Sequence, residues 1–153
     1  MDDKSLCKEL NSLIQLDIDA IQAYGMALRN IDLPVIADQL RRFQADHQRH
    51  ITDLSPIVVR HGGEVPKPTA DFKGFVIAGF TAIRSATGTE GALKAMKTNE
   101  LLTNSSYQKA VGMGLPADVA TVVQRNFEDE QRHLLFIETT LRERPWESAS
   151  AHV

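Results

Sequence analysis

Two pentapeptides in this sequence carry side chains that can coordinate metals or transfer protons. Residues 46–50 read D-H-Q-R-H and residues 129–133 read D-E-Q-R-H. Side chains three positions apart share one face of a helix, so each pentapeptide directs two such groups the same way. Imidazole nitrogen and carboxylate oxygen suit iron, manganese or zinc. The candidate metal ligands in the two pentapeptides are His47, His50, Glu130 and His133.

One offset of 83 residues (133 minus 50) relates the two pentapeptides and extends beyond them. The same shift places Asp17 on Glu100 and Tyr24 on Tyr107. In each half the acid precedes the tyrosine by two helical turns, so the two side chains share a face. A lone Glu-x-x-His is a weak signal, but its recurrence at one offset predicts two related halves. Asp17 and Glu100 therefore join the candidate ligands.

Apolar residues recur at helical spacing along nearly the whole chain, and no strand-like alternation of any length is present. We expect long helices over about residues 6–28, 34–61, 89–111 and 116–144, and a short apolar helix over about residues 72–85. Pro34 suits a first helical turn, Pro56 should kink the second helix, and Gly62 and Gly112 suit helix ends.

Short links near residues 30–34 and 112–116 predict two antiparallel helical hairpins, whereas residues 63–89 must cross the length of the bundle. The predicted fold is all-α: a four-helix bundle of two hairpins joined by a long crossover that contains the short helix. We expect one domain over residues 1–145 and a flexible tail over residues 146–153. Away from the site, we expect solvent-facing acids at Asp19, Asp38 and Asp53.

Composition and charge argue against several functional classes. The net charge is −3, and no basic face or aromatic platform stands out, so we expect no nucleic-acid binding. The longest apolar run, residues 74–83, falls short of the roughly 20 residues of a membrane helix. The N-terminus is polar and unlike a signal peptide, and the single cysteine, Cys7, favours a reducing compartment. We therefore expect a cytoplasmic protein that binds no membrane.

The doubled pattern resembles the ferritin-like superfamily of carboxylate-bridged di-metal proteins, which includes ferritins, bacterioferritins and rubrerythrins. In that superfamily two helices each supply one glutamate, and the other two each supply a Glu-x-x-His pair. The resemblance covers about residues 6–142 and is greatest to small bacterial ferritin-like proteins. Carried over residue by residue, it implies the ligands Asp17, His50, Glu100, Glu130 and His133 and the buried tyrosines Tyr24 and Tyr107. It also implies one or two ions of iron, manganese or zinc.

Asp46 and Asp129 match an acid that, in bacterioferritins, orients a ligand histidine of the other half. We expect Asp129 to contact His50 and Asp46 to contact His133. Alternatively, the two aspartates pair with arginines on the helix surfaces, where such pairs are common. The arginines in reach are Arg42, Arg49, Arg125 and Arg132.

Three positions depart from the superfamily pattern. Asp17 is one methylene shorter than the usual glutamate, and His47 replaces the glutamate that bridges both metals. Gln48 stands where bacterioferritins have a methionine that binds haem, so no haem is predicted. Because a neutral imidazole has one free lone pair, we expect Glu130 to be the only bridge. Unequal metal sites follow: a stronger one at Glu100, Glu130 and His133, and a weaker one at Asp17, His47 and His50.

Two functions of different class remain open. In the first, the protein is a di-metal oxidoreductase that binds Fe(II) and reduces O2 or peroxide, in iron oxidation or stress defence. In the second, it is a metal-free or single-metal bundle with a binding or structural role, and its polar core is a hydrogen-bond network. The apolar segment 75–83 is expected either to cover one face of the bundle or to pair with another subunit, which would give a homodimer. The metal content of the purified protein separates the two functions.

Overall fold

Five helices make up the part of the chain that the computed structural model describes, which is residues 1–67, 83 and 86–150. They are α1 (Asp3–Leu28), α2 (Pro34–Arg60), α4 (Gly88–Val111), α5 (Ala117–Glu143) and α6 (Pro145–Ser150). Within those ranges there is no β-strand. The short helix expected over residues 72–85 lies outside the described residues, apart from the buried Ile83.

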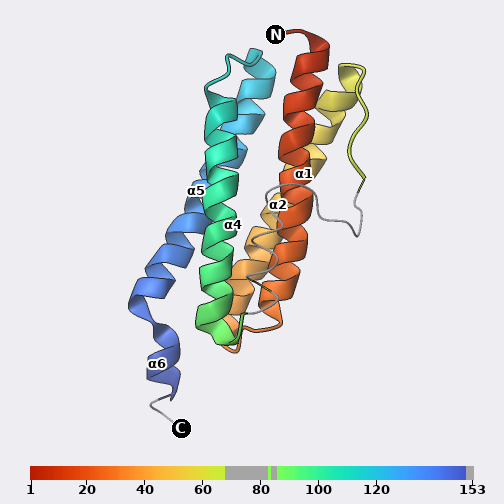
Figure 1. Ribbon diagram of the computed structural model, residues 1–153. Coiled ribbons are helices and arrows are strands. Elements are labelled where there is room, and N and C mark those ends of the chain that lie inside the picture. Colours follow the sequence, from red (N-terminus) through yellow and green to blue (C-terminus); the bar gives the residue numbers. More distant parts are fainter. Residues whose placement is uncertain (68–82, 84–85, 151–153) are drawn as a thin grey trace.

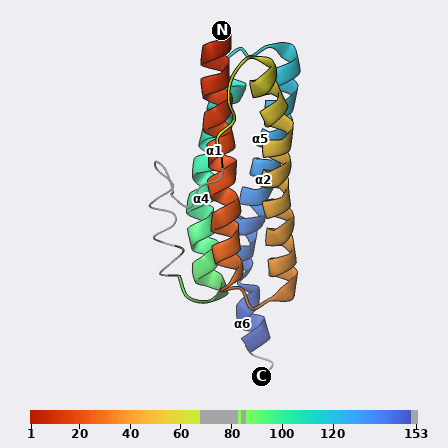
Figure 2. The ribbon, with the colours of Figure 1, turned by 90° about the vertical axis from the view of Figure 1, so that its right-hand side faces the viewer.

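The four long helices lie side by side as a bundle (Figure 1). α1 and α2 form one antiparallel hairpin, and α4 and α5 form the other. α1 packs against α4 and α2 packs against α5, which closes the bundle (Figure 2). The predicted all-α bundle of two hairpins is therefore confirmed. Among the described helices, none has the length and apolar character needed to cross a membrane.

Local sequence signals explain where the helices begin and end. The Asp2 carboxylate accepts a hydrogen bond from the backbone N–H of Ser5 at 2.7 Å and caps α1. Pro34 begins α2, where its missing N–H costs no helical hydrogen bond. α2 continues through Pro56 and ends before Gly62, whose φ of 81° favours glycine.

After α5, Pro145–Ser150 form the short helix α6. The guanidinium of Arg144 lies 2.8 Å from a carboxylate oxygen of Glu90 and 2.6 Å from one of Glu147. It also lies 5.4 Å from the centre of the Trp146 ring. These contacts hold the start of α6 close to the first turn of α4. The domain boundary at residue 145 and the flexibility of the tail stay predictions.

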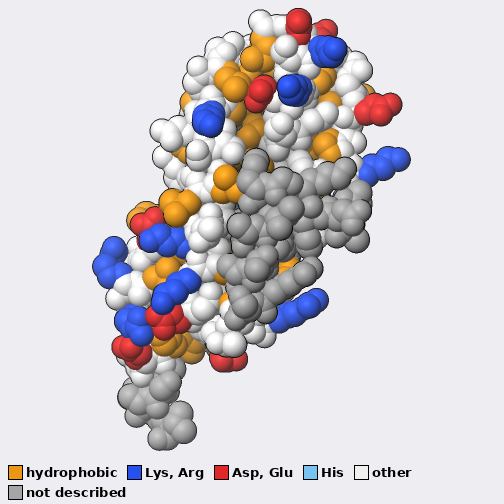
Figure 3. Space-filling model, in the orientation of Figure 1, with side chains coloured by type: hydrophobic (Ala, Val, Ile, Leu, Met, Phe, Trp, Pro, Cys, Tyr) orange, Lys and Arg blue, Asp and Glu red, His pale blue; other side chains and the backbone are white. Residues whose placement is uncertain are grey.

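Apolar side chains from the four long helices fill the interior, for example Leu10, Leu40, Leu93 and Ile137. Cys7 is buried among them. Among the residues that are coloured by type in Figure 3, Lys and Arg are interspersed with Asp and Glu, so the described part of this face shows no single-sign patch. Midway along the bundle, buried polar residues interrupt the apolar core.

One of the three acids expected to face solvent is buried. Asp19 is only 2% exposed, because α1 is covered on every side at residues 16–20. Gln15 donates a hydrogen bond to one Asp19 oxygen at 3.0 Å, and burial raises the pKa of the carboxyl to about 6. Asp38 is exposed and Asp53 is partly exposed. The periodicity of a single helix did not reveal that its outer face is covered.

Candidate metal centre

The six candidate ligands converge at the middle of the bundle, and each has no exposed surface. α1 supplies one acid and α4 another, while α2 supplies two histidines and α5 a Glu-x-x-His pair. The convergence predicted from the repeat is therefore present. The six residues are Asp17, His47, His50, Glu100, Glu130 and His133.

These side chains form two overlapping groups, in each of which one ligand atom per residue lies within 4.8 Å of all the others. The first group is Asp17, His47, His50 and Glu130, and the second is His47, Glu100, Glu130 and His133. Glu130, which we expected to be the only bridge between two metals, belongs to both groups, and so does His47. The imidazole is shared because its two nitrogens point to different carboxylates.

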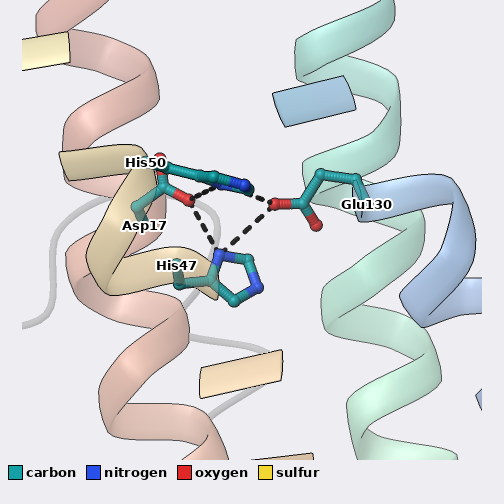
Figure 4. Close-up of side chains that lie close together, drawn as sticks. All are labelled: Asp17, His47, His50 and Glu130. Atoms are coloured by element: carbon teal, nitrogen blue, oxygen red, sulfur yellow. Dashed lines mark hydrogen bonds and ion pairs between the residues drawn. The ribbon is translucent and has the colours of Figure 1, made fainter. Parts of the chain in front are cut away.

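The first group is built around the Asp17 carboxylate (Figure 4). Asp17 Oδ1 lies 2.7 Å from His47 Nδ1 and 3.1 Å from His50 Nδ1. Glu130 Oε1 approaches from the opposite helix, 3.3 Å from His47 Nδ1 and 3.5 Å from His50 Nδ1. Two imidazole nitrogens and two carboxylates thus surround one point, which is the arrangement of a cation site.

The second group is looser. Glu100 Oε1 lies 3.4 Å from His47 Nε2 and 3.4 Å from His133 Nδ1, and His133 Nδ1 lies 3.7 Å from Glu130 Oε2. Two atoms of the site, His133 Nδ1 in this group and Glu130 Oε1 in the first, make ion-pair contacts but no hydrogen bond in the described part of the chain. Each of them can therefore take a further ligand.

Each tyrosine reaches across to the acid of the other half. Tyr24 of α1 donates to Glu100 of α4, and Tyr107 of α4 donates to Asp17 of α1 at 2.7 Å. The repeat placed both tyrosines on the acid-bearing faces but did not say which acid each would meet. These hydrogen bonds orient both acids. Asp17 contacts His47 and His50 through its other oxygen, whereas Glu100 uses Oε1 both for Tyr24 and for the histidines.

Sequence analysis missed two supporting residues on α4. Thr103 Oγ1 lies 3.0 Å from Glu130 Oε2 and 3.2 Å from Glu100 Oε2, so its single proton can be donated to either carboxylate. Asn104 donates to the backbone oxygens of Glu100 and Glu130 at 2.8 and 3.0 Å. The spacing of three between Glu100 and Thr103 was the available signal, because it places both on one helical face.

Both expected contacts between the histidines and the outer aspartates are present. His50 Nε2 lies 3.0 Å from Asp129, and His133 Nε2 lies 2.8 Å from Asp46. The alternative expectation is also correct in part, because arginines contact the same carboxylates. Those arginines are Arg49 and Arg132, whereas Arg125 pairs with Asp53 at 2.6 Å.

The histidines and acids mutually favour their charged forms. Burial lowers the pKa of His47, but Glu130, Asp17 and Glu100 outweigh burial and raise it to about 10. Burial likewise lowers the pKa values of His50 and His133, but neighbouring acids outweigh it and raise them to about 10 and about 11. Conversely, burial raises the pKa values of the Asp17 and Glu100 carboxyls, but the histidines outweigh it and lower both. Protons thus compensate the acids inside the core.

The two halves differ in the residue that covers the histidines. Phe43 stacks on His133 with ring centres 4.2 Å apart. The offset of 83 places Asn126 at the position equivalent to Phe43. Asn126 has no exposed surface, and neither of its amide atoms has a hydrogen-bond partner in the described residues. Burial and the neighbouring acids raise the pKa of Tyr107, while the nearby Asn126 amide acts in the opposite direction.

Comparisons with known proteins agree with the fold. Residues 5–112 match the family described as Domain of unknown function (DUF2383), so the match ends before α5 with Glu130 and His133. The structure is similar to the crystal structure of a conserved hypothetical protein, rv2844, from Mycobacterium tuberculosis, with a TM-score of 0.75 and 12% identity. The similarity covers 91% of this chain and 96% of that one, and it concerns the fold alone. No match is found among the curated proteins.

Proposed function

The chain belongs to the DUF2383 family, and we propose that it is a ferritin-like metal-binding protein whose bundle core holds one or two transition-metal ions. Iron is the first candidate, and manganese and zinc accept the same nitrogen and oxygen ligands. The ligands in this proposal are Asp17, His47, His50, Glu100, Glu130 and His133.

The observation that carries the proposal is a fully buried set of six ligand-type side chains, two of whose polar atoms make no hydrogen bond in the described residues. Leaving a buried donor or acceptor unpaired costs about 1–3 kcal/mol. Glu130 Oε1 lies beside His47 and His50 in the first group, and His133 Nδ1 lies beside Glu100 in the second. A cation in either group would give the atom there a further contact, and the outer aspartates would hold the histidine rings in place.

Iron in this site would supply electrons for reduction of O2 or peroxide, which makes an oxidoreductase role part of the proposal. The protein's own contribution is to orient the ligands and exclude bulk water. Tyr24 and Tyr107 fix the two single acids, and Thr103 holds Glu130. His50 and His133 each keep Nε2 on an aspartate, so their Nδ1 atoms stay directed at the site.

The test is the metal content of untagged protein purified without chelator, followed by anaerobic titration with Fe(II). We expect one to two equivalents in the wild type, fewer in Glu130→Gln, and wild-type content in Glu128→Gln. Glu128 is a matched control because it lies on α5 two residues before Glu130 and is exposed. Wild-type protein that stays metal-free after iron loading would rule out the function.

A second candidate, a metal-free bundle with a binding or structural role, is favoured by one observation. His47 places Nδ1 2.7 Å from Asp17 and Nε2 3.4 Å from Glu100, so a doubly protonated ring can donate to an acid of each half without a metal. With His50 and His133 also protonated, three positive charges balance the three buried acids. On this alternative the cluster is a charge-balanced hydrogen-bond network.

The substitution His47→Glu discriminates between the two candidates. If the protein binds metal, a glutamate restores a carboxylate that can bridge, so metal stoichiometry should rise towards two and Fe(II) oxidation should accelerate. If the core is metal-free, the same change adds an uncompensated buried acid, so stability should fall and no metal should be gained. Wild-type protein that already binds two ions and oxidises Fe(II) as fast as the variant would refute the unequal-site hypothesis.

We also propose a homodimer and a cytoplasmic location. The apolar segment 75–83, on which the dimer prediction rests, lies outside the described residues apart from Ile83. Light scattering at several protein concentrations tests the dimer, and a monomer at high concentration would contradict it.

A further inference from the structure

We propose that Asp46, Arg49, Asp129 and Arg132 form a gate through which a divalent cation reaches the buried ligands. These four residues are called the Arg–Asp cluster below. This proposal rests on the proposed metal binding. It adds the route by which the ion enters and the residues that control its entry. It concerns the surface between α2 and α5.

The cluster lies between the buried ligands and solvent. The side chains of His50 and His133 are 0% exposed, those of Asp46 and Asp129 are each 15% exposed, and those of Arg49 and Arg132 are 43% and 53% exposed. Exposure therefore increases stepwise from the histidines to the arginines. All four residues lie where α2 packs against α5. Together these features place the cluster between the buried histidines and water.

Each guanidinium contacts both aspartates. Arg132 Nη2 lies 3.0 Å from Asp46 Oδ2 and 2.9 Å from Asp129 Oδ1. Arg49 Nη1 lies 3.2 Å from Asp46 Oδ1, and Arg49 Nη2 donates to Asp129. The carboxylate oxygens that face the histidines are thus also the oxygens that the arginines neutralise. The planar fork of arginine suits this double contact.

The charges of the cluster oppose the approach of a cation. Two guanidinium groups lie at the outer end of the path, and they compensate the two carboxylates that would otherwise attract a positive ion. A cation must therefore displace the arginines before it can reach the histidines. Without the arginines, the same path would begin with two carboxylates that no guanidinium compensates, and these would raise the local concentration of cations.

A purely structural role predicts a different result. Exposed ion pairs contribute little to folding stability, so a simple cross-link between α2 and α5 would change stability slightly and leave binding rates alone. A gate changes the rates of association and dissociation in the same direction. The equilibrium affinity then changes less than either rate.

The experiment compares two double variants that remove the same charge. Arg49→Gln/Arg132→Gln opens the cluster. Arg42→Gln/Arg125→Gln removes two arginines at equivalent repeat positions, including the α2–α5 ion pair with Asp53, but leaves the cluster intact. Co(II) is the probe, and its absorbance is followed by stopped flow for association and by competition with a chelator for dissociation. Thermal unfolding checks that each variant is folded.

We expect the first double variant to bind and release Co(II) at least about tenfold faster than the wild type, and the second to keep wild-type rates. Added salt should accelerate binding to the wild type, because it weakens the ion pairs of the gate, and should slow binding to the first variant. Equal acceleration in both double variants, or unchanged rates in the first, would overturn the gate while leaving metal binding intact. Failure of the wild type to bind Co(II) would overturn the gate together with the proposed function.

Discussion

The His47 ring lies between the carboxylates of Asp17 and Glu100, so its protonation state sets the charge at the centre of the site. With protons on both nitrogens, the ring can donate to both acids. A metal ion needs one nitrogen without its proton. Protons and metal ions therefore compete for His47, and metal affinity should increase with pH.

The metal-free protein should lose stability as the pH rises above neutral. The pKa values of His47 and His50 are raised from 6.5 to about 10, and that of His133 to about 11. A raised pKa in the folded state stabilises the protein below the unfolded pKa, and this contribution is lost as the pH passes the folded pKa. The free energy of unfolding in urea should therefore fall between about pH 6.5 and pH 11.

Two single variants show whether the buried histidines cause this fall. His47→Gln should make it shallower, whereas His61→Gln should leave it unchanged, because His61 lies outside the cluster and pairs with the exposed Asp3. A free energy of unfolding that stays constant across this range would contradict the protonated state of the core histidines.

Asn126 should be replaceable with a gain in stability. Its amide is fully buried and has no hydrogen-bond partner in the described residues, so Asn126→Leu should raise the free energy of unfolding by about 1–2 kcal/mol. Asn104→Leu is the matched control, since Asn104 makes two hydrogen bonds, and it should lower stability by about 1 kcal/mol. Urea denaturation measures both. Destabilisation by Asn126→Leu would mean that the amide pairs with the nearby Tyr107 hydroxyl or holds a bound molecule.

At the scale of the elements, α1 meets the end of α2 at Gly63. A Cβ atom at Gly63 would lie 2.7 Å from Cys7 Sγ and 2.9 Å from Val58 Cγ1, closer than atoms can pack. Cys7 itself contacts the backbone oxygen of Val58 at 3.6 Å. The absence of a side chain at position 63 therefore lets the connection after α2 turn back against α1.

Gly63→Ala should lower the free energy of unfolding by about 1–3 kcal/mol, because the new methyl group must displace Cys7 or Val58. The control is Gly112→Ala at the end of α4, where the nearest atom would be 3.6 Å away. That change should stay within about 0.5 kcal/mol. Adding Cys7→Ala to Gly63→Ala should recover part of the loss, and a purely additive double variant would show that Cys7 is not the obstacle.

At the scale of the whole molecule, the two hairpins are joined through the polar core as well as through apolar contacts. Tyr24 and Tyr107 cross between α1 and α4, and the Arg–Asp cluster crosses between α2 and α5. Each of these links occurs twice, related by the internal repeat. The site therefore lies where the two halves exchange hydrogen bonds, and it depends on both.

Removing either tyrosine hydroxyl should destabilise the bundle by a similar amount. Tyr24→Phe and Tyr107→Phe each take a donor from a buried carboxylate, at a cost of about 1.5–3 kcal/mol. Urea denaturation of the metal-free variants measures the effect, and each tyrosine serves as the other's control. A large loss in one variant and none in the other would show that only one half relies on this hydrogen bond.

Helix geometry is local, and for that reason the sequence alone determined the fold class and which side chains share a face. The spacing of three in each pentapeptide and the offset of 83 were sufficient to predict the convergence of the six candidate ligands. The same symmetry predicted that His50 meets Asp129 and His133 meets Asp46. An internal repeat therefore predicts some contacts between residues that are far apart in the sequence, because equivalent side chains of the two halves face each other.

Only the tertiary structure decided features that depend on how the hairpins pack. The repeat could not show that Asp19 is covered, that His47 serves both halves, or that Asn126 is buried without a partner. Each depends on atoms from helices distant in sequence, brought together at separations of a few ångströms. A periodic pattern specifies the direction of a side chain from its own helix. It does not specify what the neighbouring helix places there.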